Sequence, residues 1–142
     1  MLLPDVNVLV YAYREDATPQ HLRSRQWLED LANSDEPFGL SDLVLSSFIR
    51  IVTHPGIFPM PTPIDVAFAQ AQDLRNQPNC VPLTPGNRHW QIFTRLCQET
   101  GARGKLVPDA YLAALAIESG SVWITWDGDY GRFDGLHWRR PL

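Results

Sequence analysis

The chain has 142 residues and a mass of 16.1 kDa, the size of one typical domain, so we expect a single domain over residues 1–142. Apolar residues make up 44% of it and charged residues 20%, which excludes a disordered or fibrous protein. A formal net charge of −4 argues against unspecific coating of a polyanion, because the long-range field would repel it.

The N-terminal part alternates between apolar and helical patterns. An apolar run over residues 2–5 predicts a short buried strand, and residues 7–13 predict a helical turn or two. A helix is expected over 20–32, and Ser41 should cap another over 42–53. The apolar stripe of the helix over 20–32 is predicted to consist of Leu22, Trp27, Leu28 and Leu31.

Prolines divide the middle of the chain. Four of them between residues 55 and 63 predict a loop, after which Pro63 opens a helix to about residue 75. Residues 80–83 predict a second short strand, and a helix over 87–100 is expected to stop at Gly101.

The C-terminal part continues the alternation. Pro108 suits the first position of a helix over 109–119, and residues 121–125 predict a strand that ends in a turn at 127–129. Strands that alternate with helices predict a mainly parallel sheet covered on both faces. The expected fold is therefore a three-layer α/β/α sandwich.

The cysteine usage and the apolar runs bear on the compartment. Cys80 and Cys97 lie in unrelated contexts, so neither a zinc site nor a disulfide is predicted, and we expect buried thiols in a reducing compartment. The start of the chain lacks the pattern of a signal peptide, and no stretch approaches the ~18 apolar residues of a membrane span. A cytoplasmic protein without membrane contact is expected.

Several carboxylates stand where a parallel sheet would gather them. Asp5 ends the first strand, Asp109 begins a helix, and Asp127 ends the late strand with Asp129 two residues further on. Side chains at such positions converge beyond the carboxyl ends of the strands. Because grouped carboxylates repel one another, they either take raised pKa values or need a cation. Carboxylate ligands favour Mg²⁺ or Mn²⁺ over zinc, and such an ion activates water for attack on a phosphate.

Each of these residues also has an ordinary structural explanation. Asp109 is favoured in the first turn of a helix by the helix dipole, and Asp127 and Asp129 are common turn formers. Asp5 is the strongest candidate, because it interrupts an apolar run and a buried carboxylate is costly without a partner. Asn7 could cap the following helix or orient Asp5.

Four segments of the chain carry a family resemblance. Residues 4–12, 43–55, 107–116 and 124–133 read PDVNVLVYA, LVLSSFIRIVTHP, VPDAYLAALA and ITWDGDYGRF. In this order they resemble the four motifs of PIN-domain ribonucleases, specifically toxins of the VapC type. The match extends over nearly the whole chain.

The resemblance implies a Mg²⁺- or Mn²⁺-dependent endoribonuclease toxin that cuts structured RNA, such as tRNA or rRNA, and so inhibits translation. It also implies a cognate VapB-like antitoxin that silences the enzyme, and a homodimer. The acidic positions of the family match Asp5, Asp109 and Asp127, with Asp129 as an accessory. Asp5 and Asp109 would hold the metal, directly or through water, and Asp127 would complete its shell.

The second motif departs from the family. Where the family usually has Glu, this chain has Ser47, or Ser46 if the alignment shifts by one residue. A serine hydroxyl brings no charge. Asp42 is the nearest substitute, but on a helix it lies about 140° around from Ser47, although it shares a face with Ser46. Asp42 is equally well explained as an acid at a helix N-terminus.

Two further residues of the motifs are accessory candidates. Arg50 follows the serine pair and could reach a phosphate, pair with an acid or be solvated. Thr125, two residues before Asp127, could orient a carboxylate or simply pack in a strand.

Two other functions stay open at this point. The missing Glu allows a catalytically weak PIN-like module that binds RNA or an antitoxin without cutting. A phosphatase of the haloacid-dehalogenase type would also have an Asp after the first strand, but it needs a second Asp where this chain has Asn7.

Overall fold

A five-stranded parallel sheet forms the centre of the computed structural model, which describes residues 1–142. The strands are β1 (Leu2–Pro4), β2 (Phe38–Leu40), β3 (Cys80–Pro82), β4 (Val122–Ile124) and β5 (Trp138–Arg139). Their order is β3-β2-β1-β4-β5, and every neighbouring pair is parallel. The strand nearest the N-terminus is therefore central, with β4 and β2 on its two sides.

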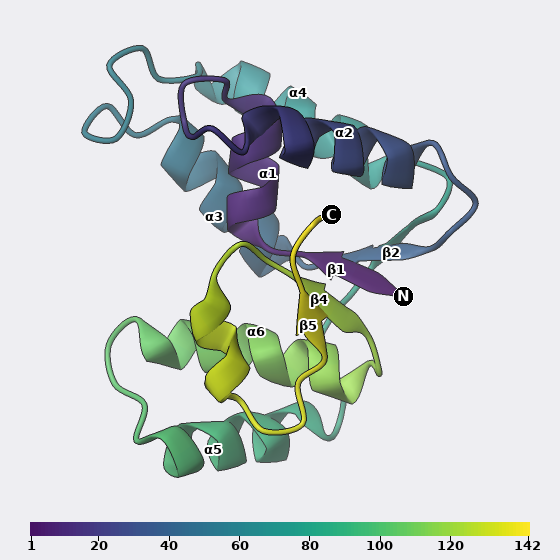
Figure 1. The fold of residues 1–142 in the computed structure, drawn as a ribbon, viewed down its shortest axis with the longest axis vertical. Coiled ribbons are helices and arrows are strands. Elements are labelled where there is room, and N and C mark those ends of the chain that lie inside the picture. The colour runs from purple at the N-terminus through teal and green to yellow at the C-terminus, as the bar shows by residue number, and fades with distance from the viewer.

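Six α-helices and one short 3-10 helix surround the sheet. They are α1 (Val6–Tyr13), α2 (His21–Ala32), α3 (Asp42–Val52), α4 (Ile64–Arg75), α5 (His89–Thr100), α6 (Leu106–Glu118) and the 3-10 helix η1 (Gly128–Arg132). Helices α1 to α4 lie on one face of the sheet, and α5 and α6 lie on the other (Figure 1). The expected three-layer α/β/α fold is confirmed. No helix combines the length and the apolar character that crossing a membrane requires.

The core lies where both helical layers meet the central strands. All three residues of β1 are buried, because helices cover the sheet on both faces. Helix α6 buries a run of small residues that includes Ala113, Ala114 and Ala116, which lets it pack closely on the sheet. One cluster of 29 buried apolar residues joins the two layers.

Most expected elements occur close to their predicted bounds. Ser41 caps α3 as expected, with its Oγ accepting a hydrogen bond of 3.1 Å from the backbone N–H of Val44. Gly101 ends α5 with a φ of 62°, a left-handed conformation that glycine adopts without strain.

Some expectations about helices and thiols were wrong. Leu22 is 75% exposed, because the buried face of α2 follows the i, i+4, i+7 line of Ser24, Leu28 and Leu31, and Leu22 lies about 120° around from Leu28. Helix α6 begins at Leu106, so Pro108 stands within its first turn, where its missing N–H leaves no helical bond unmade. Both cysteines are free thiols as expected, but they are only half-buried.

Two strands were missed. β2 and β5 have three and two residues, too few to show a periodic pattern. They are strands because their backbones pair with β1 and β4, a relation between segments distant in sequence.

Candidate active site

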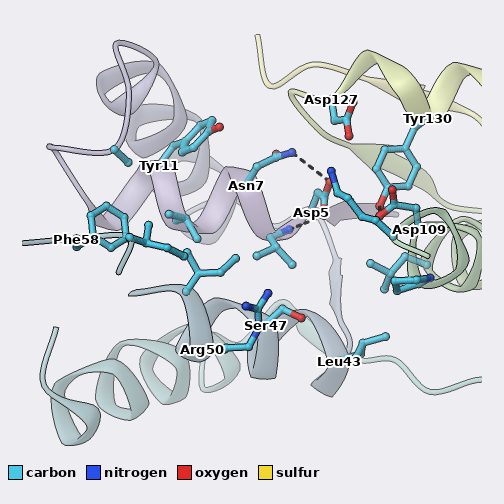
Figure 2. Close-up of a pocket in the computed structure, with 18 of the residues that line it drawn as sticks. Asp5, Asn7, Tyr11, Leu43, Ser47, Arg50, Phe58, Asp109, Asp127 and Tyr130 are labelled. Atoms are coloured by element: carbon cyan, nitrogen blue, oxygen red, sulfur yellow. Dashed lines mark hydrogen bonds between the residues drawn. The ribbon is translucent and has the colours of Figure 1, made fainter. Parts of the chain in front are cut away.

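A pocket of about 750 Å³ opens beyond the carboxyl ends of β1 and β4. These adjacent parallel strands lead to opposite sides of the sheet, since β1 runs into α1 whereas β4 runs toward η1 near α6 (Figure 1). Crevices at such switch points are the usual ligand sites of parallel sheets. Asp5, Asp109 and Asp127 all line this pocket, although they come from distant parts of the chain (Figure 2).

Asp5 is held at the junction of β1 and α1. Pro4 occupies the last position of β1, and the next backbone N–H, that of Asp5, bonds to the carbonyl oxygen of Ile124 at 2.8 Å. The Asp5 carboxylate caps α1 by accepting a bond of 2.6 Å from the N–H of Val6. With the residue only 5% exposed, burial raises the pKa of Asp5 to about 6, and the charges of Asp109 and Asp127 add to the rise.

Asn7 and Thr125 orient the Asp5 carboxylate. The Thr125 hydroxyl donates to Oδ2 of Asp5 at 2.7 Å, and Nδ2 of Asn7 lies 3.3 Å from the same oxygen. Asn7 also donates to Oγ1 of Thr125 and accepts from the N–H of Trp126. Of the two explanations for Asn7, the structure therefore favours orientation of Asp5, since Asp5 itself is the cap of α1.

Asp109 lies in the first turn of α6 and is half-buried. The Tyr130 hydroxyl donates to its Oδ1 at 3.3 Å. Burial raises the pKa of Asp109, while the nearby Lys105 opposes that rise. Burial also raises the pKa of Tyr130, with the neighbouring carboxylates adding to the effect, so its hydroxyl stays a hydrogen-bond donor. Sequence reasoning missed Tyr130, although it stands in the fourth motif three residues after Asp127.

The turn after β4 separates its two acids. Asp127 is both a turn former and a pocket residue, because its Oδ1 accepts from the N–H of Asp129 at 2.9 Å while its side chain lines the pocket. The Asp129 side chain is 73% exposed and lies 3.6 Å from Arg132, outside the pocket. Asp129 is therefore not brought together with the other three acids.

Helix α3 presents different residues to two hollows. Ser47 and Arg50 line the pocket with the acids, whereas Asp42 and Ser46 line a separate hollow of about 320 Å³ against α4. Oδ1 of Asp42 lies 3.6 Å from the Arg75 guanidinium there. Helix α3 thus brings a hydroxyl and a guanidinium to the pocket but no carboxylate, and Asp42 does not stand in for the missing Glu.

The donors of the pocket fit a hard divalent ion. No three His, Cys, Asp or Glu side chains are grouped tightly enough to ligate one ion directly as they stand. Magnesium, however, typically uses one or two carboxylates and keeps several waters, so it needs no such cage. The buried Asp5, with its raised pKa, and the two neighbouring acids make an all-oxygen set whose mutual repulsion a cation would relieve.

Comparison with known proteins assigns the chain to a family. The family model of the PIN domain matches residues 2–136, so the chain belongs to the PIN-domain family. The chain is similar to VapC ribonuclease Mb2897 of Mycobacterium bovis, with 45% identity over 142 residues that cover 100% of this chain and 96% of that protein. It is also similar to ribonuclease VapC25 of Mycobacterium tuberculosis, with 40% identity over 141 residues that cover 99% of either protein. The resemblance to the VapC group is thereby confirmed.

Solved structures share the fold at lower identity. VapBC2 from Rickettsia felis, bound to a promoter DNA fragment, has a TM-score of 0.69 at 15% identity and covers 98% of this chain and 97% of that chain. FitAcB from Neisseria gonorrhoeae has a TM-score of 0.70 at 20% identity and covers 99% of this chain and 98% of that chain. At these identities the likeness concerns the fold, which it confirms.

Proposed function

We propose that the chain is a divalent-metal-dependent endoribonuclease of the VapC type that hydrolyses phosphodiester bonds in RNA. The observation that carries the proposal is the arrangement of Asp5, Asp109 and Asp127 around one pocket. It is supported by membership of the PIN-domain family and by full-length relatives that are named ribonucleases.

Each pocket residue has a distinct task in this proposal. Asp5 and Asp109 would hold Mg²⁺ or Mn²⁺ directly or through water, and Asp127 would complete its shell. Such an ion would activate water and offset the charge of a phosphate under attack. Thr125 and Asn7 fix the Asp5 carboxylate through bonds of 2.7 and 3.3 Å. Tyr130 fixes one Asp109 oxygen, which leaves the other free for a ligand. Partners of this kind keep ligating oxygens in place.

The same relatives support a proposal for the biological setting. We propose a toxin of a toxin–antitoxin pair that acts on tRNA or rRNA, inhibits translation, and is silenced by a VapB-like antitoxin. The antitoxin is supported by solved structures of the same fold that are described as VapBC complexes. We also propose a homodimer. Sequencing of the RNA ends generated after induced expression identifies the target.

A cleavage assay tests the proposed reaction. The purified chain should fragment RNA in Mg²⁺ and stop when EDTA is added. Asp5→Asn and Asp109→Asn should lower the rate by at least about 100-fold while the fold is retained, because each removes a proposed ligand. The control is Asp35→Asn, which neutralises an exposed acid outside the pocket. Full activity in either pocket variant contradicts the assignment.

The absence of an acid from α3 supports a second candidate. Ser47 faces the pocket without charge, so one ligand fewer is available than in the usual motif. If the chain binds RNA or an antitoxin without cutting, the same assay gives retention of RNA on a gel without new fragments. New fragments that depend on Mg²⁺ exclude this candidate.

A further inference from the structure

The pocket extends well beyond the three acids. Away from Asp5, it is lined by apolar and aromatic side chains of α1, α3 and the loop that precedes α4. We call this part the apolar lobe and define it by Tyr11, Ile51, Ile57 and Phe58. In Figure 2 the labelled Tyr11 and Phe58 lie at one end of the pocket, and Asp109 and Asp127 lie at the other. A hydrated ion and a phosphate do not need an apolar lobe.

Arg50 lies between these two ends. Its side chain comes from α3 near Ser47 and points into the pocket (Figure 2). The ion pairs of the chain involve five other arginines, so the Arg50 guanidinium has no carboxylate partner. Because a Glu at position 47 would stand one helical turn away and could pair with it, the serine there leaves this cation available.

Arg14 holds the wall of the apolar lobe in place. Its guanidinium donates to the carbonyl oxygen of Met60 at 2.8 Å and to Oγ1 of Thr62 at 3.1 Å, and it lies 4.1 Å from the centroid of the Phe58 ring. Two hydrogen bonds to Asp16, of 2.9 and 2.6 Å, fix the guanidinium itself. The lobe is therefore formed before any ligand enters, which lowers the cost of binding.

We propose that Arg50 and the apolar lobe bind one nucleotide of the RNA beside the bond that is cut. Arg50 binds a backbone phosphate through its planar pair of N–H donors, and an unpaired base stacks on the partly exposed Tyr11. Phe58 is only 5% exposed and forms part of the apolar wall of the lobe. Along the pocket, the three acids are followed by the Arg50 cation and then by the aromatic wall. Along an RNA strand, the phosphate that is cut is followed by the next phosphate and a base, so the two orders correspond. Single-stranded loops offer such bases, so the substrate class is RNA with an unpaired nucleotide at the cut.

An apolar peptide segment is the competing occupant. It would fill the lobe, but it would leave the Arg50 charge unused, whereas a nucleotide uses both parts. The proposed nucleotide site rests on the proposed function, but it is tested by measuring nucleotide binding and not by measuring cleavage. Loss of cleavage without loss of nucleotide binding would affect the proposed function alone.

Nucleotide titrations followed by backbone amide NMR test the inference. The probes are adenosine 5′-monophosphate and adenosine, each added to the full chain in Mg²⁺ buffer. The monophosphate should bind roughly tenfold or more tightly than adenosine, since a charge-assisted hydrogen bond distinguishes them, and should shift amides of α3 and of the loop at Phe58. Equal binding of both probes, or shifts confined to other surfaces, overturns the inference.

Three variants separate the parts of the nucleotide site. Arg50→Gln should bring the ratio of the two affinities close to one, whereas Arg75→Gln, which removes an arginine of the other hollow, should leave it unchanged. Tyr11→Leu should weaken both probes by about tenfold, because stacking is lost, and should preserve the ratio. An unchanged ratio in Arg50→Gln, or unchanged affinities in a folded Tyr11→Leu, contradicts the proposal. A lobe that takes up an apolar peptide but neither probe points to the competing occupant and also contradicts it.

Discussion

The ionisation of Asp5 is set by two opposing effects, hydrogen bonding and burial. It accepts three hydrogen bonds, from Val6, Thr125 and Asn7. Those from Thr125 and Val6 favour the charged form against the opposing effect of burial. Burial is the larger effect, so the pKa of Asp5 is raised to about 6. The residue therefore destabilises the metal-free protein at neutral pH, and a bound cation would remove that cost.

The pH dependence of stability follows from that pKa. Because the folded value of about 6 exceeds the ordinary value of 3.8, the folded chain binds the proton more tightly than the unfolded chain. The stability that protonated Asp5 contributes is present below about pH 4 and is lost as the pH rises through 6, a change of about 3 kcal/mol at about 1.4 kcal/mol per pH unit. Urea unfolding of the metal-free chain between pH 4 and 7 measures this change in the free energy of unfolding. Asp5→Asn is the reference, and equal slopes for both proteins would refute the pKa assignment.

Thr125 carries a second prediction at this scale. Thr125→Val keeps the shape of the side chain but removes the hydroxyl that donates to Asp5 at 2.7 Å. The apparent pKa of Asp5 should rise further, and the free energy of unfolding at pH 7 should fall by about 1–2 kcal/mol, because a buried charge loses a donor. Thr84→Val, at an exposed position, should change it by less than about 0.5 kcal/mol. Urea unfolding of the two variants decides the matter, and equal losses would mean that the hydroxyl does not serve Asp5.

At the scale of elements, the helices were easier to predict than the strands. Ser41, Pro63 and Gly101 mark helix ends by local chemistry, and α3, α4 and α5 begin or end beside them. The strands β2 and β5 have no such local mark, since pairing with distant segments defines them. The conformation of the loop before α4 was equally hidden, because Arg14 and Met60 are 46 residues apart.

The loop before α4 should depend on Arg14. Arg14→Met removes the hydrogen bonds to Met60, Thr62 and Asp16, and we expect a loss of about 1–3 kcal/mol in the free energy of unfolding together with faster amide exchange over residues 57–62. Arg25→Met breaks only an exposed pair with Glu29 on one helix and should cost no more than about 0.5 kcal/mol. Hydrogen exchange followed by mass spectrometry makes the comparison. Unchanged protection of the loop in Arg14→Met would show that other contacts hold it.

At the scale of the whole molecule, the parallel topology gathers the site. Asp5 and Asp127 follow adjacent strands, and α6 brings Asp109 to the same edge from the other layer. This gathering could be predicted from the order of strands and helices, because the carboxyl ends of parallel strands share one edge. The orientation of α3 could not be predicted, because Ser46 and Ser47 fit the same motif equally well. Only the packing of the helix turns Ser47 toward the acids. Tyr130 and the apolar lobe depend on tertiary contacts in the same way.

We propose that three distant aspartates together hold one divalent ion, directly or through its bound waters. Titration of the metal-free chain with Mn²⁺ in a calorimeter tests it most directly, using Asp5→Asn, Asp109→Asn and Asp127→Asn, with Asp129→Asn as the control outside the pocket. We predict that each of the first three weakens Mn²⁺ binding by about tenfold or more and that the control leaves it unchanged. Binding that survives all three substitutions, or that is lost only with Asp129, would contradict the account.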